Sequence, residues 1–465
     1  MKFLFIYPPM ETIITNKMFS FEGYAPPLGI LYLASILEKN GHKVEVIDYT
    51  AEQYHPDRLK QKINSSDAVG LTVLATTLKA SSEISDTIKK YDKNIPIIIG
   101  GPQCLVSPEK CMKDIKADIC VIGEAENTIK DIEKYLITGN GIEKIKNIYY
   151  RKNGKINKNN GIGVIENLDK LPFPNRKLIE KYKYGNMSGL NLSKGKFTSM
   201  ISSRGCPFKC RFCISSKYPI KKYRSRSAEN VIDEIKIISE KFDSLLIADD
   251  NFLANRKRVK TIMEKIIEEK IDLEFWIEGA RVDSADKKLF KLMKKAGVRA
   301  IEFGIESGNN DVLSFYNKQT TTQEIKKAVN ISNKTGFITI GNFILGAPIE
   351  NQKYFQNTID FAKKLSLDIA FFYQLGYLKG CDLWDEANKK GIIKSDEIAV
   401  QSGSDNGLGD LSTETIQKWI TKAYKDYYTN PKYILTQILR AAKRRDLSFI
   451  KAGYNMFIKG NNDLK

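Results

Sequence analysis

The amino-terminal third of the chain alternates short apolar runs with stretches of helical periodicity. The apolar runs are expected as buried strands, at residues 2–9, 43–48, 68–74, 96–101 and 118–123. The stretches between them are expected as helices, at residues 28–39, 56–64, 79–91 and 126–138. Strands of nearly continuous apolar character are typical of a parallel sheet covered by helices on both faces. The pattern therefore predicts a doubly wound, flavodoxin-like parallel sheet in residues 1–139.

This rhythm breaks between residues 140 and 196. Asn153-Gly154 separates two short runs, which is a hairpin signal. The segment Leu171-Pro-Phe-Pro174 cannot be helical, because each proline and the residue before it favour extended backbone. We expect residues 140–196 to form an ordered linker.

A second run of alternating strands and helices follows the linker. Its strands are expected at residues 197–203, 245–249, 273–280, 300–307, 337–346 and 369–376. Its helices are expected at residues 228–241, 255–269, 284–296, 322–335 and 352–365. Six such units predict a parallel (β/α)6 barrel of the TIM type, complete or partial, in residues 197–400. Residues 401–465 read as a basic helical region, in which Pro431 opens one helix.

Composition narrows the class of protein. The 465 residues are 42% apolar and 28% charged, and 74 basic against 55 acidic residues give a net charge of +19. Nucleic acid or an anionic membrane could explain this excess. The lysines are spread along candidate helices, however, so we favour a solvated basic surface and do not expect nucleic acid as a partner. No apolar stretch is long enough for a transmembrane segment or a signal peptide, and the seven cysteines are odd in number, which predicts a soluble cytoplasmic protein.

Three cysteines lie within eight residues, directly after the strand expected at 197–203. Cys206, Cys210 and Cys213 have the spacing C-x3-C-x2-C. A disulfide would leave one thiol over, zinc would need a fourth ligand, and ordinary buried thiols are a further alternative. A cubane cluster normally takes four cysteines, so three would leave one iron open to a small molecule.

This motif resembles the signature of the radical S-adenosylmethionine (SAM) superfamily, in which an aromatic residue, here Phe212, precedes the last cysteine. The resemblance implies a 4Fe–4S cluster held by the three cysteines and a six-unit partial barrel. It also implies that the open iron binds the amine and carboxylate of SAM. Reductive cleavage of SAM would give a 5′-deoxyadenosyl radical, with electrons supplied by a donor such as flavodoxin or ferredoxin.

Ligands of parallel α/β folds bind at the carboxyl ends of the strands. That rule selects Asp250, which follows the second strand, and Arg281, which follows the third and is a natural partner for a carboxylate. The resemblance implies that Phe212 lies near the adenine. It also implies that Gly304, Glu306 and Ser307, in Gly-Ile-Glu-Ser-Gly, contact the methionine or ribose of SAM. A helix cap or a surface ion pair remains the alternative for each carboxylate.

The amino-terminal region resembles the cobalamin-binding domain that precedes many radical SAM modules. The matching segments are Pro26-Pro27-Leu28-Gly29, Gly41-His42-Lys43-Val44, Ile99-Gly100-Gly101-Pro102 and Ile122-Gly123-Glu124-Ala125-Glu126. We therefore expect cobalamin to bind at Gly100, Gly101, Gly123 and Glu124. No Asp-x-His-x-x-Gly motif is present, so cobalamin would be held without a histidine below the cobalt. We expect His42 to be a turn residue.

The remaining cysteines, Cys104, Cys111, Cys120 and Cys381, are expected as buried thiols. Cys381 or Tyr373 could instead donate hydrogen to a product radical, and no catalytic residue is assigned. Our preferred function is a cobalamin-dependent radical methyltransferase that acts on an unactivated carbon of a small molecule or lipid. One SAM would supply the methyl group and a second the radical. The alternatives are a radical enzyme that forms or rearranges a bond without methyl transfer, and a cofactor-binding sensor without turnover.

Overall fold

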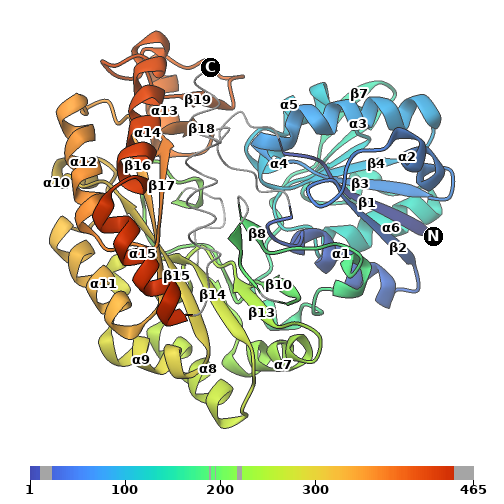
Figure 1. Cartoon of the computed structure of the whole chain (residues 1–465). Helices are drawn as coiled ribbons and strands as arrows, with labels where there is room; N and C mark the ends of the chain where they lie inside the picture. The colour runs from blue at the N-terminus through green and yellow to red at the C-terminus, as the bar shows by residue number, and fades with distance from the viewer. Residues whose placement is uncertain (11–22, 188–189, 194, 217–222, 445–465) are drawn as a thin grey trace. The chain divides into compact units, whose positions relative to one another are not determined.

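The computed structural model divides the chain into two compact units. It describes residues 1–10, 23–187, 190–193, 195–216 and 223–444. Unit 1 holds the described residues up to 184, and unit 2 those from 185 onward. Each unit is built on its own sheet (Figure 1).

Unit 1 is a seven-stranded sheet with the strand order β2-β1-β3-β4-β5-β6-β7. Its first five strands run parallel: β1 Lys2–Tyr7, β2 Lys43–Asp48, β3 Ala68–Thr72, β4 Ile97–Gly100 and β5 Ile119–Val121. The helices between them are α1 Leu28–Lys39, α2 Pro56–Ile63, α3 Leu78–Tyr91, α4 Pro102–Val106, α5 Pro108–Asp114 and α6 Thr128–Thr138. The order 2-1-3-4-5 is that of flavodoxin, so the predicted doubly wound sheet is confirmed.

The stretch expected as a linker mostly belongs to unit 1. β6 Ile148–Lys152 and β7 Lys155–Lys158 form the expected hairpin, and β6 pairs antiparallel with β5, which extends the sheet. Further along, Tyr184 donates its hydroxyl hydrogen bond to Asp48 Oδ2 at 2.8 Å. The strand–helix rhythm cannot reveal such a segment, because an antiparallel hairpin needs no crossover helix.

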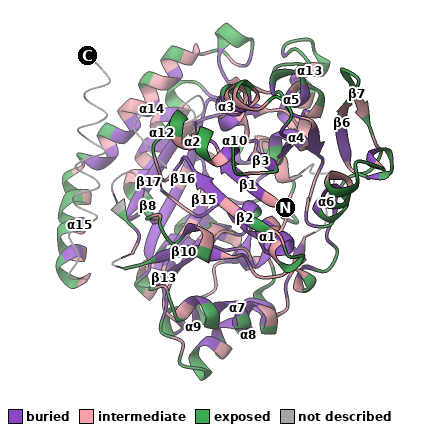
Figure 2. Cartoon of the chain, turned by 90° about the vertical axis from the view of Figure 1, so that its right-hand side faces the viewer, coloured by how far each residue is buried: buried purple, intermediate pink, exposed green. Residues whose placement is uncertain are grey.

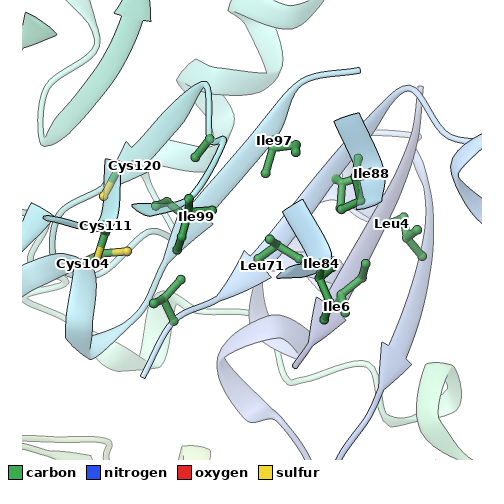
Figure 3. Packing of buried hydrophobic residues seen from close by; sticks show 14 of the residues in the cluster. Leu4, Ile6, Leu71, Ile84, Ile88, Ile97, Ile99, Cys104, Cys111 and Cys120 are labelled. Carbon is green, nitrogen blue, oxygen red and sulfur yellow. The ribbon is translucent and has the colours of Figure 1, made fainter. Parts of the chain in front are cut away.

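The core of unit 1 contains three of the cysteines. Aliphatic side chains of β1, β3 and β4 pack on Ile84 and Ile88 of α3, and Cys104, Cys111 and Cys120 lie beside them (Figure 3). All three thiols are fully buried, and burial raises the pKa of Cys104 well above its ordinary value. The expectation of buried apolar thiols is met at these positions.

Unit 2 is built on six parallel strands that pair in chain order (Figure 1). They are β10 Phe197–Met200, β13 Ser244–Ile247, β14 Glu274–Ala280, β15 Val298–Glu306, β16 Ile338–Leu345 and β17 Ile369–Gln374. The helices are α7 Ala228–Ser239, α8 Arg256–Glu268, α9 Lys287–Lys295, α10 Asn310–Phe315, α11 Thr322–Thr335 and α12 Gln352–Lys364. In the described part of the chain β10 and β17 are not paired with each other, so the barrel is partial.

The helices cover the outer face of this sheet. Phe303 of β15 stacks on Phe290 of α9, with ring centroids 6.4 Å apart. Side chains alternate along a strand, so Glu302 and Gly304 point to the opposite, inner face. Strand residues are mostly buried and the outer helices carry the exposed positions (Figure 2).

Beyond β17 the chain forms a short strand pair and three helices. The pair is β18 Gly376–Leu378 with β19 Ala399–Gln401, and the helices are α13 Asp382–Lys389, α14 Thr413–Tyr428 and α15 Pro431–Arg444. Tyr424 and Tyr428 of α14 donate to backbone carbonyls of β17 at 3.1 and 3.0 Å. Their hydroxyls thereby satisfy polar groups along an unpaired edge strand.

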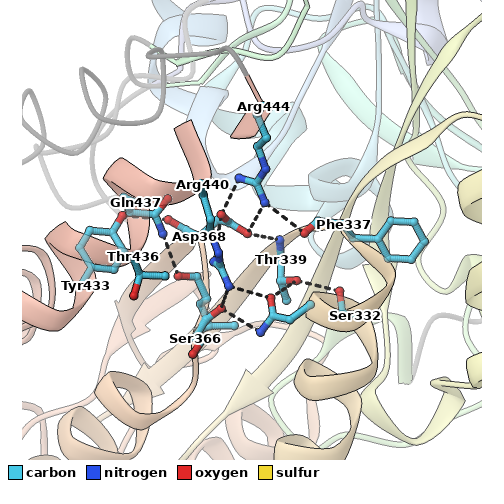
Figure 4. Close-up of polar contacts among 12 residues, drawn as sticks. Ser332, Phe337, Thr339, Ser366, Asp368, Tyr433, Thr436, Gln437, Arg440 and Arg444 are labelled. Atoms are coloured by element: carbon cyan, nitrogen blue, oxygen red, sulfur yellow. Dashed lines mark hydrogen bonds and ion pairs between the residues drawn. The ribbon is translucent and has the colours of Figure 1, made fainter. Parts of the chain in front are cut away.

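The last described helix is tied to the barrel by a buried carboxylate. Asp368 is 1% exposed, and Arg440 and Arg444 of α15 lie 3.0 and 2.7 Å from its Oδ1 (Figure 4). The expected helical region is thus present up to Arg444, with Pro431 at its start; residues 445–465 lie outside the described residues. Within the described ranges, no helix is both long and apolar enough to cross a membrane.

Two further strand pairs lie outside the two large sheets in the described part of the chain. β11 Ser203–Arg204 pairs with β12 Arg224–Ser225, and β8 Asn186–Met187 pairs with β9 Leu190–Asn191. The β11–β12 pair flanks the cysteine loop, so both ends of that loop are held.

Candidate active site

The cysteine loop begins at the carboxyl end of β10, where a buried aspartate fixes its course. Asp249, 2% exposed, accepts hydrogen bonds from the backbone N–H and hydroxyl of Ser202, both at 2.6 Å, and from the Ser203 hydroxyl at 2.6 Å. Both carboxylate oxygens of Asp249 are therefore engaged in hydrogen bonds within the protein. Asp250 accepts from the Gly205 N–H at 3.0 Å, one residue before Cys206.

The three motif thiols lie among hydrogen-bond donors and positive charge. The Asn251 amide lies 3.9 Å from Cys206 Sγ, and Arg281 Nη1 lies 3.8 Å from Cys210 Sγ. Burial raises the pKa of the Cys210 thiol, while the nearby charges of Lys318 and Arg281 act against that rise. Cationic neighbours favour the thiolate, which is the form that binds iron.

The arrangement fits a multinuclear cluster better than a single ion. Among the residues that the structure describes, no three His, Cys, Asp or Glu side chains gather closely enough to hold one metal ion. In a 4Fe–4S cluster each cysteine binds a different iron, so its ligands stand further apart than those of one ion. The three cysteines on one loop, with donors near two of the sulfurs, supply the ligand types that such a cluster needs.

A buried ion pair lies at the carboxyl end of β15. Lys318 Nζ is 2.6 Å from Glu306 Oε1, and both side chains are 7% exposed. Glu306 has φ +65°, and the Ser307 N–H donates to the Ile305 carbonyl at 2.9 Å across it. Such a tight turn at a non-glycine residue costs about 1–3 kcal/mol and is typical of functional sites. A Cβ at Gly304 would lie 2.5 Å from Glu306 Oε1, so only glycine leaves room for the pair.

Arg281 connects this pair to the cysteine loop. Its guanidinium donates to the Lys318 carbonyl at 2.6 Å and to Asp283 Oδ2 at 3.0 Å, and it stacks 3.6 Å from the Phe208 ring. Because its Nη1 lies near Cys210, the Arg281 side chain bridges the cysteine loop and the carboxyl ends of the strands. The carboxylate that it contacts is Asp283 of its own turn.

The other predicted residues divide between this edge and the interior. Phe212 packs edge-on against Tyr316, with ring centroids 5.1 Å apart. Ser307 is fully buried, lies 3.3 Å from the Thr358 hydroxyl and accepts from the Asn309 N–H at 3.2 Å. The structure therefore brings the cysteines, Asp250, Arg281, Gly304 and Glu306 to one edge of the sheet and turns Ser307 into the protein.

Sequence reasoning missed one polar side chain of this edge, Lys318, whereas Asn251 belongs to the strand-end segment that the same rule selects. Lys318 lies between Asn317 and Gln319, whose φ angles are +50° and +56°. A lysine between two residues of left-handed conformation carries no sequence signal of its partner. Cys381 proves to be the N-cap of α13, where its sulfur accepts from the Trp384 N–H at 3.4 Å.

In unit 1 the candidate cobalamin site is the carboxyl edge of β3, β4 and β5. Gly101 has φ +114°, and a Cβ there would lie 2.8 Å from the Val73 carbonyl oxygen, so the backbone approaches closely next to Gly100. Gln103 is 3% exposed and its Nε2 has no hydrogen-bond partner in the described residues. An orphaned amide at this edge fits a site for a polar ligand.

Gly123 and Glu124 have partners within the chain. A Cβ at Gly123 would lie 2.5 Å from the Gly163 carbonyl oxygen, and the Glu124 N–H donates to that oxygen at 2.9 Å. The Glu124 carboxylate accepts from the Ile165 N–H at 2.5 Å. Both residues hold the segment around Gly163 against the end of β5.

The two histidines are not placed to bind cobalt at that edge. His42 lies in the turn between α1 and β2, at the amino end of the strand, as expected. Its Nε2 is 2.7 Å from Glu133 Oε1 and its Nδ1 is 3.1 Å from the amino terminus. His55 is exposed at the N-cap of α2.

Comparisons with known proteins agree with this geometry. Residues 200–362 match the model of the radical SAM superfamily, and residues 18–133 match that of the B12-binding domain. An uncharacterised methyltransferase of Pyrococcus horikoshii is 32% identical over 94% of this chain and 95% of that protein. Cytidylyl-2-hydroxyethylphosphonate methyltransferase of Streptomyces wedmorensis is 23% identical over 86% of each chain.

Two solved structures have the same fold. The cobalamin-dependent SAM radical enzyme OxsB, with aqua-cobalamin and SAM bound, gives a TM-score of 0.72 at 19% identity, over 97% of this chain and 72% of that one. The radical SAM methyltransferase TsrM of Kitasatospora setae, with cobalamin and a [4Fe–4S] cluster bound, gives 0.69 at 16% identity, over 84% and 78%.

Fold, cysteine loop and family matches together define a radical SAM enzyme that carries a B12-binding domain. The chain belongs to the radical SAM superfamily, in the group of the Pyrococcus horikoshii methyltransferase. The cofactors of this class are a 4Fe–4S cluster, SAM and cobalamin, as the sequence indicated.

Proposed function

We propose that the protein is a cobalamin-dependent radical methyltransferase that acts on an unactivated carbon. One observation carries the proposal: a flavodoxin-like unit that matches the B12-binding model precedes a partial barrel with three cysteines at the end of its first strand. The methyltransferase names of two relatives support the choice of reaction.

The bound cofactors would supply an electron, an organic radical and a methyl group, while the chain binds and orients them. Cys206, Cys210 and Cys213 would hold the cluster. The Glu306 carboxylate would accept hydrogen bonds from an ammonium group or from ribose hydroxyls of SAM. Lys318 holds that carboxylate in place, because the two side chains are paired at 2.6 Å in a buried setting. Gly304 leaves the space that the pair occupies.

Gly100, Gly101 and the Gln103 amide would line the cobalamin edge of unit 1. Gly123 and Glu124 would shape this edge through the segment that they hold. Since both nitrogens of His42 are engaged, we infer that no histidine of this chain lies below the cobalt.

The partners follow from the chemistry of the reaction. The substrate would be a small molecule or a lipid, and TsrM has been seen with tryptophan bound. An acidic electron donor such as flavodoxin or ferredoxin would match the net charge of +19. All seven cysteines are free thiols, from which we infer a reducing cytoplasm as the compartment.

A second candidate is bond formation without methyl transfer. It is favoured by another relative, the anaerobic magnesium-protoporphyrin IX monomethyl ester cyclase of Rubrivivax gelatinosus, which is 26% identical over 84% of this chain and 70% of that protein. A sensor without turnover would bind the same cofactors and consume no SAM.

Anaerobic reconstitution with iron, sulfide and hydroxocobalamin tests the proposal. Cobalt should remain bound after gel filtration, with a spectrum that shows no nitrogen ligand, and His42→Ala should leave that spectrum unchanged. SAM should then be consumed under strong reductant. Loss of cobalt together with continued formation of 5′-deoxyadenosine would favour the bond-forming candidate, and cofactor binding without SAM consumption would favour the sensor.

A further inference from the structure

Four neighbouring strands of unit 2 each place one polar side chain on the inner face of the sheet. We call Glu278 (β14), Glu302 (β15), Asn342 (β16) and Tyr373 (β17) the inner polar row. Glu278 follows Ile277, which pairs with Ile301 on the outer face. Asn342 pairs with Gly304 of the inner face, and Tyr373 follows Phe372, which packs on α14.

The row is partly accessible although its neighbours along the strands are mostly buried. Asn342 Nδ2 donates to Glu302 Oε1 at 2.6 Å. In the described part of the chain the Glu278 carboxylate has neither a hydrogen bond nor an ion pair; burial, and then the charges of Glu302 and Asp250, raise its pKa to about 8. The pKa of Glu302 is raised by burial as well.

Positive charge nearby is already committed to other carboxylates. Lys318 pairs with Glu306, Arg281 with Asp283, and Arg299, at the start of β15, lies 2.7 Å from Glu274. The two glutamates of the row therefore face each other without a cation. Two carboxylates in this setting repel each other, and a bound cation would remove that cost.

Two orphaned polar groups on the same face point independently to a ligand. Trp276, two residues before Glu278, is 3% exposed, and its indole Nε1 has no hydrogen-bond partner among the described residues. The Oδ1 of Asn342 is buried and likewise has no partner in that part of the chain. Leaving a buried donor or acceptor unpaired costs about 1–3 kcal/mol. A donor on a ligand would recover this cost at the Asn342 oxygen, and an acceptor on the same ligand would recover it at the Trp276 N–H.

We propose that the inner polar row is the substrate site, and that the substrate carries a protonated amine that binds between Glu278 and Glu302. This inference rests on the proposed function, which requires a substrate next to SAM. Glu302 lies two residues before Gly304 on β15, and Glu278 lies three residues before Arg281. The row therefore lies on the same strands as the carboxyl edge that holds Glu306 and Arg281, one to two residue pairs further into the sheet.

A cationic nitrogen fits better than a neutral or an anionic group. An ammonium group offers only donors, and the row offers carboxylate and amide oxygens as acceptors. Without a ligand, burial and the proximity of the two carboxyl groups favour the protonated form of Glu278. A bound ammonium group would favour the ionised pair, an anion would oppose it, and a neutral polyol would not stabilise it.

Ligand-observed NMR on the reconstituted enzyme tests the site with four matched probes. Tyramine, tryptamine, putrescine and glucosamine are each compared with their N-acetyl derivatives, in which the positive charge is removed. We expect at least one amine to bind about tenfold more tightly than its acetylated partner, and the preference to vanish in Glu278→Gln/Glu302→Gln. Glu268→Gln, at the exposed carboxyl end of α8, is the control and should keep the preference.

The iron content of each variant verifies that the barrel is folded, and Glu278→Gln alone replaces the double variant if that one loses iron. Absence of any amine preference in the wild type, or a preference that survives the substitutions, would overturn the inference. Tighter binding of the neutral partner that depends on the two glutamates would also overturn it. Amine preference without methyl transfer would leave the site standing and reject the proposed function.

Discussion

Replacement of Glu278 by glutamine should stabilise the protein at alkaline pH. Burial and the neighbouring carboxylates raise the pKa of Glu278 to about 8 in the folded protein, against about 4.3 in an unfolded chain. The folded state therefore binds a proton that the unfolded state has released at neutral pH. The contribution of the Glu278 carboxyl to the free energy of unfolding is complete below about pH 4 and is lost as the pH rises toward about 8.

The magnitude follows from the width of that window. Each pH unit between the two pKa values changes the free energy of unfolding by at most about 1.4 kcal/mol per group. Between about pH 6 and pH 8 the wild type should lose about 2–3 kcal/mol relative to Glu278→Gln. The titrations of Glu302 and Glu278 are coupled, so removing the Glu278 carboxylate also lowers the pKa of Glu302. The measured difference in the free energy of unfolding therefore belongs to the pair.

Urea unfolding of both proteins at a series of pH values measures this difference. Subtracting the two curves cancels every titration that the proteins share, and Glu268→Gln, at the exposed end of α8, controls for a general change in net charge. A difference that does not depend on pH between about pH 6 and pH 8 would refute the reasoning, because it would mean that the Glu278 carboxyl is already ionised in the folded protein.

Three further predictions concern other parts of the chain. Replacing the three motif cysteines by alanine should abolish iron binding and its thiolate-to-iron absorption, whereas Cys104→Ala should retain both; an iron-replete triple variant would refute the cluster assignment. Lys318→Met should destabilise the protein by about 3–5 kcal/mol and weaken SAM binding, because it leaves the buried Glu306 carboxylate without its ion-pair partner. An unchanged free energy of unfolding together with unchanged SAM binding by calorimetry would refute this prediction. Asp368→Asn should cost about 1.5–3 kcal/mol in urea unfolding by releasing α15, and Asp360→Asn, at an exposed site, should cost little.

The sequence predicted the parallel strands of both sheets because each is an apolar run that ends at glycine or a polar residue. Residues 43–48, for example, were expected as a strand and form β2 with the same bounds. The strand–helix pattern did not show where the expected hairpin would pack, because an antiparallel hairpin needs no crossover helix. β6 and β7 were therefore placed in a linker, although they extend the sheet of unit 1.

The sequence predicted those residues of the candidate site whose role can be recognised from a short segment of the chain. The cysteine spacing and the strand-end positions of Arg281 and Glu306 were read directly from the chain. Lys318 was not, because its ion pair with Glu306 depends on how a turn after α10 folds back to β15. Glu278 was missed because a glutamate within an apolar strand shows its partners only when neighbouring strands are in register.

The fate of the methyl group of SAM tests the central claim most directly. Reconstituted enzyme is incubated anaerobically with a strong reductant and with SAM that carries a trideuterated methyl group, with and without cobalamin, and the products are quantified by mass spectrometry. The account predicts one S-adenosylhomocysteine per bound cobalt, with the label on cobalamin, and none when cobalamin is omitted. Formation of 5′-deoxyadenosine alone, with no S-adenosylhomocysteine in the presence of bound cobalamin, would contradict it.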